Sequence, residues 1–297
     1  MKLGSGIVLF VMGSAFSLAH AASPDPYGAE QARADIKATL GFVPGFFNVF
    51  PDEGIAGAWD EFKSVQLNPK TAVPSKYKEL IALGVASQIP CEYCIYFHTK
   101  AATANGATER ELKEAVAISA VVRHWSTLLN GALLDEGQFK KDLDQVVQNA
   151  LAAAKSPSKA QPAAATPTNA AEARADIAST LGFVPAMFGV VPEQGLAGAW
   201  RELKTLQLNP DTAIPGKYKE MIALGVAAQI PCRYCTVFHR TVASKLGGAS
   251  EAELQEAVAM SALVRHWSTV LNGNQIDKAT FRREVDRALG GGKSATN

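Results

Sequence analysis

The sequence predicts an all-α protein built from two tandem copies of one helical unit. Residues 27–150 and 171–290 carry the same motifs, for example Arg-Ala-Asp-Ile at 33–36 and again at 174–177, an offset of 141 residues. Proline, glycine and asparagine turn signals separate stretches of helical length. No run of alternating β-branched residues is long enough for a sheet. Two copies with so long a period do not suit a solenoid, so we interpret them as a tandem duplication.

The N-terminal segment 1–21 has the pattern of a secretory signal peptide. Lys2 precedes an apolar run from Ile7 to Met12, and Ala-His-Ala at 19–21 has the form of a cleavage site. The apolar run is too short to span a bilayer as a mature helix. We therefore expect cleavage after Ala21, a periplasmic location and no stable membrane insertion of the mature chain. A retained membrane anchor is the alternative.

Each helix of the first unit has its own start and stop signals. Proline begins two of the helices because it cannot continue a preceding one, and Asn-Pro or Asn-Gly pairs end others. Thr108 and Glu111 have the spacing of a capping box. The predicted helices are 30–40, 54–65, 74–88, 90–105, 108–129 and 135–151, and the second unit repeats the same signals.

Residues 151–170 join the two units. They are rich in Ala, Pro, Ser and Thr and contain no large apolar residue after Leu151, which is a linker composition. The whole chain has 29 Lys and Arg residues against 28 Asp and Glu residues, with no basic run. This charge pattern argues against nucleic acid as a partner.

All four cysteines lie in two matching windows, which carry the chemistry of the chain. In each window a glutamate stands twelve residues before a Cys-x-x-Cys pair, and a histidine follows four residues after it. In a helix the two cysteines and the histidine share a face, and cysteines in a first turn are stabilised as thiolates. The candidate catalytic residues are Glu79, Cys91, Cys94 and His98 in the first unit and Glu220, Cys232, Cys235 and His239 in the second.

Three kinds of site share this pattern: a structural disulfide, a redox-active dithiol and a zinc site. A bridge between residues three apart closes a very small loop and contributes little stability, which argues against a structural role. Zinc would need two thiolates, one imidazole and the carboxylate of Glu79, an unusual ligand set. We therefore favour the redox-active dithiol and expect no cofactor, with a Cys/His metal-binding protein as an alternative.

The repeated Glu, Cys-x-x-Cys and His pattern resembles the AhpD-like alkylhydroperoxidase and carboxymuconolactone decarboxylase superfamily, over nearly the whole chain outside 1–21 and the linker. The resemblance implies two AhpD-like helical domains. It also implies a proton relay from Glu through His to the cysteine pair, which reduces hydroperoxides and is recharged by a thioredoxin-like or other dithiol. The decarboxylase branch usually lacks the cysteine pair, and a non-redox decarboxylase-like enzyme is the alternative. Tyr93 and Tyr234 stand where AhpD has a second histidine.

The resemblance further implies a homo-oligomer. For the two cysteines of the first pair, we expect Cys94 to attack the peroxide and Cys91, nearer the helix end and more exposed, to resolve the sulfenic acid. Exchanged roles, with the outer cysteine attacking as in thioredoxin-type pairs, are the alternative. Because Arg233 favours the thiolate form of its neighbours and Glu92 disfavours it, we expect the two sites to be unequal.

Four further residues have simpler interpretations. His124 and His266 lie beside tryptophans in long helices, which is typical of packed core residues. Lys78 and Lys219 belong to Lys-Tyr-Lys motifs that we interpret as solvated helix faces.

Overall fold

A computed structural model describes residues 28–155 and 166–290, and these residues form helices and no strand. The all-α prediction is therefore confirmed. The predicted signal peptide 1–21 lies outside the described residues, and so does segment 156–165 of the predicted linker. No helix in the described ranges is long and apolar enough to cross a membrane.

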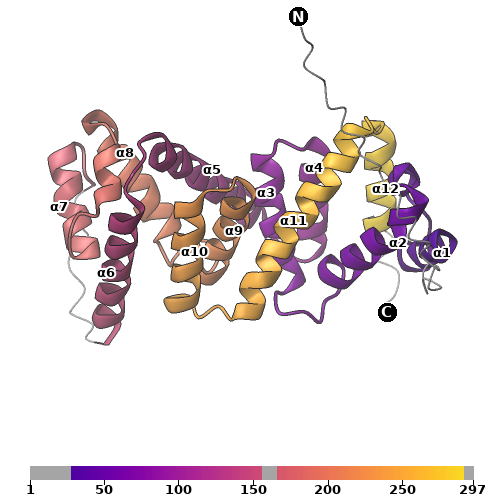
Figure 1. Cartoon of the computed structure of the whole chain (residues 1–297), viewed down its shortest axis with the longest axis horizontal. Coiled ribbons are helices and arrows are strands. Elements are labelled where there is room, and N and C mark those ends of the chain that lie inside the picture. The colour runs from indigo at the N-terminus through magenta and orange to yellow at the C-terminus, as the bar shows by residue number, and fades with distance from the viewer. Residues whose placement is uncertain (1–27, 156–165, 291–297) are drawn as a thin grey trace, which may run out of the picture.

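The two repeats contain the same series of helices (Figure 1). The first has α1 (Ala29–Leu40), the 3-10 helix η1 (Gly45–Val49), α2 (Asp52–Glu61), the π-helix η2 (Phe62–Gln66), α3 (Ser75–Gln88), α4 (Glu92–Ala104), α5 (Glu109–Gly131) and α6 (Glu136–Lys155). The second has α7 (Ala170–Leu181), η3 (Ala186–Val190), α8 (Glu193–Glu202), η4 (Leu203–Gln207), α9 (Gly216–Gln229), α10 (Arg233–Lys245), α11 (Glu251–Gly273) and α12 (Lys278–Gly290).

Local signals explain where several of these helices begin and end. The capping box is present at α5, where the Thr108 hydroxyl accepts from the Glu111 N–H at 3.2 Å and Glu111 accepts from the Thr108 N–H at 2.8 Å. α1 ends at Gly41, whose φ of 81° is left-handed. The sequence did not predict the 3-10 and π segments, and α6 continues to Lys155, inside the predicted linker.

The prediction that the cysteine helix starts at Pro90 is wrong by two residues. α4 starts at Glu92, and Cys91 is its N-cap, with an extended backbone and a sulfur that accepts from the Cys94 N–H at 3.2 Å. The sulfur takes the place of the side-chain oxygen that usually caps a helix. Cys232 caps α10 in the same way. Each cysteine pair therefore spans the boundary between a turn and a helix.

The two repeats meet at α3 and α9, which cross closely in the middle of the molecule (Figure 1). Glycine makes this crossing possible, because a Cβ atom on Gly84 would lie 3.0 Å from Ile222 of α9 and one on Gly225 would lie 2.9 Å from Ile81 of α3. Nearby, the rings of Tyr77 and Tyr218 stack with their centroids 3.5 Å apart. α5 and α11 pack around this crossing, so the centre is a four-helix core shared by both repeats.

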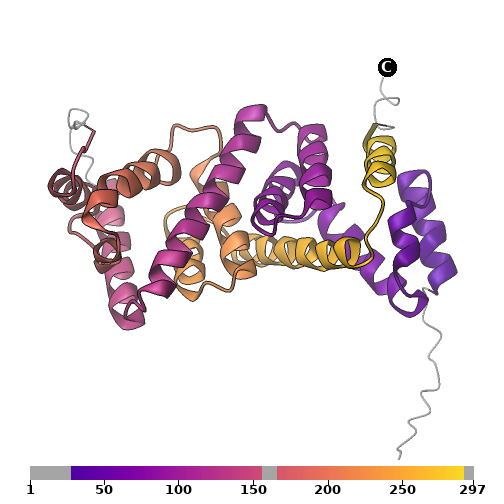
Figure 2. The same ribbon diagram turned by 90° about the horizontal axis from the view of Figure 1, so that it is seen from above.

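The last two helices of each repeat pack against the other repeat. α12 contacts α4 and η1, and α11 contacts α4 and η2; likewise α5 and α6 contact α10 and η3. Figures 1 and 2 show the yellow C-terminal helix α12 beside the indigo N-terminal helices α1 and α2. Repeats 27–150 and 171–290 are thus units of sequence, whereas each packed half of the molecule combines helices from both.

The expectation that Lys78 and Lys219 lie on solvated faces is wrong, because both side chains are 0% exposed. The Lys78 ammonium donates to the carbonyls of Val65 and Asn68 at 2.7 and 2.6 Å and lies 3.1 Å from a carboxylate oxygen of Glu256 on α11. All three of its protons therefore have acceptors, which is the condition for burying a lysine. Glu256 belongs to the other repeat, so this ion pair also ties the two repeats together.

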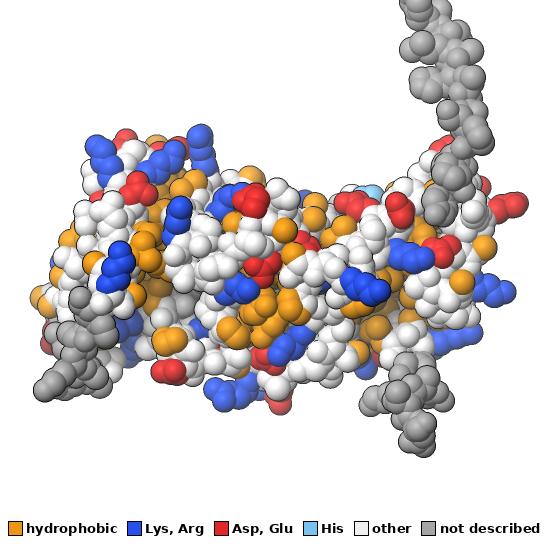
Figure 3. Space-filling model, turned by 90° about the horizontal axis from the view of Figure 1, so that it is seen from below, with side chains coloured by type: hydrophobic (Ala, Val, Ile, Leu, Met, Phe, Trp, Pro, Cys, Tyr) orange, Lys and Arg blue, Asp and Glu red, His pale blue; other side chains and the backbone are white. Residues whose placement is uncertain are grey.

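Charged side chains on the surface are mixed in sign. On the face shown in Figure 3, Lys and Arg side chains alternate with Asp and Glu side chains rather than gathering in one patch. This distribution agrees with the nearly balanced charge of the sequence.

Candidate active site

Each cysteine pair forms a disulfide, Cys91–Cys94 on α4 and Cys232–Cys235 on α10, with Cα atoms 5.3 Å apart in both. Cys91 is 1% exposed and Cys94 is 4% exposed. The expectation that Cys91 is the more exposed cysteine is therefore wrong. Its N-cap turn folds back onto α3, where the Cys91 N–H donates to the Ala86 carbonyl at 3.1 Å.

A buried hydrogen-bonded chain leads to the first pair. Glu79 lies on α3 and His98 one turn after Cys94 on α4, and the His98 Nδ1–H donates to the Glu79 carboxylate at 2.7 Å. The other oxygen of Glu79 accepts from the Gln66 side-chain amide at 3.1 Å. With Nδ1 engaged as the donor, Nε2 of His98 is the ring nitrogen left to accept a proton.

The second site repeats this chain. His239 and Glu220 lie 2.7 Å apart, and Gln207 donates to Glu220 at 2.7 Å. The structure thus brings together all the candidate residues that the sequence indicated. The sequence reasoning missed Gln66 and Gln207, although both stand in the repeated motif Gln-Leu-Asn-Pro. Both end π-helical segments, a local geometry that often occurs at functional sites.

A small apolar pocket lies beside each pair. The pocket at the first site has a volume of about 40 Å³ and is lined by Cys94 but not by Cys91. Its other walls come from both repeats: Phe46, Phe62, Gln66, Phe97 and His98 from the first, and Leu263, Val264, Trp267, Leu271 and Phe281 from the second. The second pocket, of about 30 Å³, contains Cys235 and His239 but not Cys232. In each pair, the cysteine nearer the histidine is the one that lines the pocket.

Trp267 on α11 and its counterpart Trp125 on α5 line these pockets, a role that the sequence analysis missed. The available signal was the motif Arg-His-Trp-Ser-Thr, which is identical in both repeats. The expectation that the neighbouring histidines are core residues is wrong for His124, which is exposed, whereas His266 is half-buried and stacks on Phe50. One residue turns a helix by 100°, so a tryptophan facing the pocket directs the preceding histidine elsewhere.

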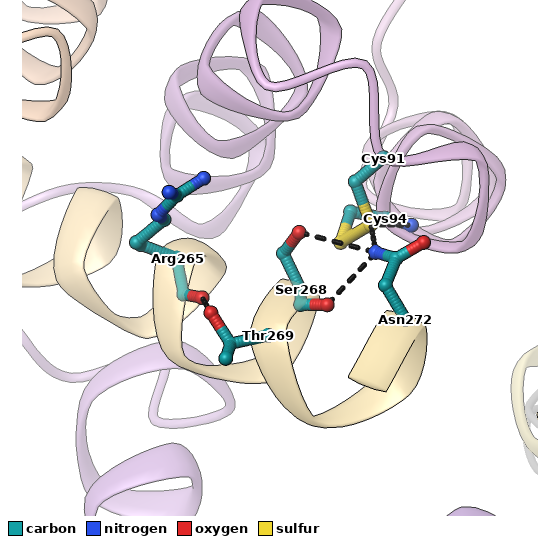
Figure 4. Close-up of a disulfide and its surroundings, with 6 residues drawn as sticks. All are labelled: Cys91, Cys94, Arg265, Ser268, Thr269 and Asn272. Carbon is teal, nitrogen blue, oxygen red and sulfur yellow. Dashed lines mark hydrogen bonds between the residues drawn. A yellow bond between two sulfur atoms is a disulfide. The ribbon is translucent and has the colours of Figure 1, made fainter. Parts of the chain in front are cut away.

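An asparagine from the other repeat reaches each disulfide. Figure 4 shows Asn272 of α11 directed at the Cys91–Cys94 pair. Its side-chain N–H₂ lies 3.5 Å from the Cys91 sulfur and also donates to the Ser268 carbonyl at 2.8 Å. Asn130 of α5 approaches the Cys232 sulfur at 3.6 Å. Neither site is complete without a residue from the opposite repeat.

Charged residues beside the pairs are matched across the repeats as well. Lys278 lies 2.7 Å from Glu92, and this hydrogen bond keeps the pKa of the Glu92 carboxyl below its usual range. Arg233 is paired with Glu136 at 3.5 Å. We expected the two sites to differ because of the opposite charges of Glu92 and Arg233. In the structure each of these charges has a partner of opposite sign. That difference stays a prediction.

No group of three or more His, Cys, Asp or Glu side chains within 28–155 and 166–290 is arranged to hold a metal ion. In the structure each cysteine sulfur is bonded to its partner sulfur. The zinc alternative would require the reduced form, because thiolates are the ligands of zinc.

The Asn272→Leu variant should make Cys91 less reactive toward an alkylating agent at neutral pH, by about tenfold. Removing an N–H donor from a thiolate costs roughly 1.5 kcal/mol, which lowers the thiolate fraction by that factor. The measurement is the alkylation rate of the reduced protein in a Cys232→Ser/Cys235→Ser background. Asn130→Leu is the matched control and should leave this rate unchanged, because Asn130 serves the other pair. Equal effects of the two variants would contradict the finding that each asparagine contacts the cysteine pair of the other repeat.

Comparison with known proteins gives three findings. A model of the carboxymuconolactone decarboxylase family matches residues 54–137 and 194–278, which together make up more than half of the chain. An uncharacterised protein of Cupriavidus necator is 42% identical over 48 residues, a segment that covers 16% of this chain and 42% of that protein. The chain thus spans less than half the length of this curated relative.

The third finding concerns a crystal structure from Burkholderia xenovorans, of a chain assigned as a gamma-carboxymuconolactone decarboxylase subunit. It superposes with a TM-score of 0.54 and 14% sequence identity, covering 86% of this chain and 99% of that one. This similarity shows a common fold.

Proposed function

The chain belongs to the carboxymuconolactone decarboxylase family, and from this premise we propose that it is a thiol-dependent peroxidase or disulfide oxidoreductase that reduces hydroperoxides. One observation carries the proposal: a redox-capable cysteine pair and a buried, hydrogen-bonded Glu–His pair lie at the same apolar pocket. Only Cys94 of its pair reaches that pocket, beside His98, and Cys235 and His239 repeat the arrangement. A nucleophile next to an oriented base is the general signature of nucleophilic catalysis.

The reaction begins with the reduced pair. The Cys94 thiolate attacks the outer oxygen of a hydroperoxide, forming an S–O bond as the O–O bond breaks; the sulfur becomes a sulfenic acid and the released alkoxide takes a proton delivered through His98. The Cys91 thiol then attacks the sulfenic sulfur, which releases water and forms the disulfide seen in the structure. Glu79 holds the His98 ring in place through the hydrogen bond to Nδ1.

An external dithiol completes the cycle by reducing the disulfide. Asn272 contacts the Cys91 sulfur but is not among the residues that line the pocket, and Asn272 itself is exposed. We infer that a thioredoxin-like or other dithiol partner attacks Cys91 from the side of Asn272, so that peroxide and reductant use different approaches. The periplasmic location and the homo-oligomeric state stay predictions from the sequence.

The name of the family favours the alternative, a non-redox decarboxylase-like enzyme, but the residues that line the pockets argue against it. A lactone bearing carboxylate groups needs cationic side chains to bind it. The residues that line the pockets at Cys94 and Cys235 include no Lys or Arg. Small or apolar hydroperoxides fit such walls better.

Peroxide consumption by the fully reduced protein tests this function. One hydroperoxide should be consumed per cysteine pair, with loss of all four thiols. Glu79→Gln combined with Glu220→Gln should slow the reaction by about a hundredfold, since a positioned proton relay contributes that much or more. Glu109→Gln, an exposed glutamate paired with Lys113, is the control and should react at the normal rate. Thiols that survive excess peroxide would refute the proposal.

A further inference from the structure

An apolar cavity of about 230 Å³ lies beside the second cysteine pair, and the mechanism above does not use it. Residues of α6, α7, α10 and the η3 and η4 segments line it. Four of its wall residues, Phe139, Met187, Leu203 and Phe238, also line the small pocket that contains Cys235 and His239. The shared walls place the cavity next to that pocket. Its volume exceeds the roughly 150 Å³ of an apolar protein cavity that binds benzene.

The cavity follows one face of α10 from Phe238, one turn after Cys235, to Leu246. Cys235, Phe238, Val242 and Leu246 are spaced three or four residues apart and therefore lie along one side of the helix. At the helical rise, this row is roughly 16 Å long. Leu246 at the outer end of the row is 39% exposed, so this end of the cavity lies near the surface. Half the hydrocarbon thickness of a bilayer, about the reach of one acyl chain, is a similar length.

The first site has different residues at the same positions. Phe46 and Phe62 stand where the second site has Met187 and Leu203. These rings pack against the aromatic cluster of the first pocket, with Phe46 and Phe62 each 6.0 Å from Trp267 between ring centroids. Methionine and leucine are smaller and more adaptable than phenylalanine, so the wall between the second pocket and its cavity yields more easily to a ligand.

The outer part of the row differs too. Ala101 and Asn105 on α4 correspond to Val242 and Leu246 on α10. The Asn105 side chain donates to the Ala101 carbonyl at 2.8 Å, so a polar group stands where the second site has the apolar side chain of Leu246. The row on α4 is therefore a poorer surface for an alkyl chain.

We propose that the second site reduces hydroperoxides that carry a long alkyl chain, of the fatty-acyl type, and that the first site is confined to small peroxides. This inference rests on the proposed function of the cysteine pairs. The alkyl chain lies in the cavity along α10 and presents its –OOH group to Cys235. The Cys235 thiolate forms the S–O bond and the O–O bond breaks, so the sulfur is oxidised to a sulfenic acid and the fatty hydroperoxide is reduced to a fatty alcohol that receives its proton through His239. Cys232 and the external dithiol then regenerate the thiolate as at the first site.

Kinetics with single-site proteins test the assignment. The Cys91→Ser/Cys94→Ser background leaves the second pair, and kcat/KM for linear alkyl hydroperoxides, relative to hydrogen peroxide, should rise about fourfold for each CH₂ group that the cavity buries. In the Cys232→Ser/Cys235→Ser background this ratio should stay nearly flat with chain length. Equal chain-length dependence at the two sites would overturn the inference.

Val146 and Ala288 offer a matched pair of substitutions. Both are half-buried at corresponding positions of α6 and α12, but Val146 lines the cavity. Val146→Trp should fill the cavity and reduce the preference of the second site for decyl over butyl hydroperoxide to that of the first site. Ala288→Trp should leave the preference intact. A preference that survives Val146→Trp would contradict the proposed place of the chain.

Binding of an unreactive product analogue separates this inference from the proposed function. In calorimetry with the full chain, 1-decanol should bind once per molecule, and Val146→Trp should abolish that binding while Ala288→Trp retains it. Absence of decanol binding overturns the inference even if peroxides are reduced. Decanol binding without reduction of any hydroperoxide at either site refutes the proposed function, and the substrate assignment falls with it.

Two sources can supply such a chain, a free fatty acid hydroperoxide or a hydroperoxide held in a phospholipid. The second-site protein is assayed with linoleic acid hydroperoxide in solution and with oxidised phosphatidylcholine in vesicles. Reduction of the first alone identifies a free fatty chain, and reduction in vesicles identifies membrane lipid. Reduction of neither overturns the inference.

Discussion

The Cys94→Ser/Cys235→Ser protein is expected to consume no peroxide beyond the background rate of the external thiol, a complete loss of turnover. These two sulfurs are the ones that line the pockets beside His98 and His239. A serine hydroxyl cannot replace them, because it forms no sulfenic acid and no disulfide. Coupled peroxide consumption measures this effect, and far-ultraviolet circular dichroism checks that the helices are unchanged.

The complementary Cys91→Ser/Cys232→Ser protein should still react once per site. It would form a sulfenic acid on Cys94 and Cys235 and then a trapped mixed disulfide with an added thiol, which intact-protein mass spectrometry detects. Trapping in the first variant and not in the second would assign the attack to the capping cysteines instead.

The Lys78→Met variant should lose about 3–5 kcal/mol of unfolding free energy. Removing the ammonium leaves the Glu256 carboxylate buried without its countercharge, and it deprives the carbonyls of Val65 and Asn68 of their donor. Breaking one side of a buried pair costs far more than the pair contributes as a whole, since the remaining charge stays desolvated. Urea unfolding followed by circular dichroism measures the change.

Lys113→Met is the matched control for this measurement. Lys113 pairs with Glu109 one turn away on the same helix, with both side chains largely exposed, so its loss should cost less than about 0.5 kcal/mol. A similar small change for Lys78→Met would show that water reaches Glu256 and that the pair does not hold the two repeats together.

Local signals were sufficient to predict most of the fold. The proline before α3, the capping box at Thr108 and the glycine after α1 act on neighbouring residues, and the structure has these helices within one or two residues of the predicted ends. The start of α4 was misplaced because a cysteine is not a usual N-cap, and only the backbone shows that Cys91 has this role. The glutamate and histidine of each site were predicted from their spacing to the cysteines.

What the sequence did not reveal depends on contacts between the repeats. Lys78 looks like a surface residue beside Lys76, and its burial depends on Glu256, which is 178 positions away in the chain. Asn272 and Trp267 complete the site of the first repeat although they belong to the second. No local pattern specifies which copy a helix will join, because the two copies carry nearly the same residues.

The last two helices of each repeat pack against the other repeat, and this packing also bears on how such a chain can evolve. One repeat alone would leave α5 and α6 without the surface they cover, so a single-repeat protein of this design would need a second copy related by a twofold axis. In that symmetric pair every substitution appears at both sites. Joining the copies in one polypeptide removes this constraint: Met187 and Leu203 can differ from Phe46 and Phe62, and the two sites are free to specialise while still sharing one core.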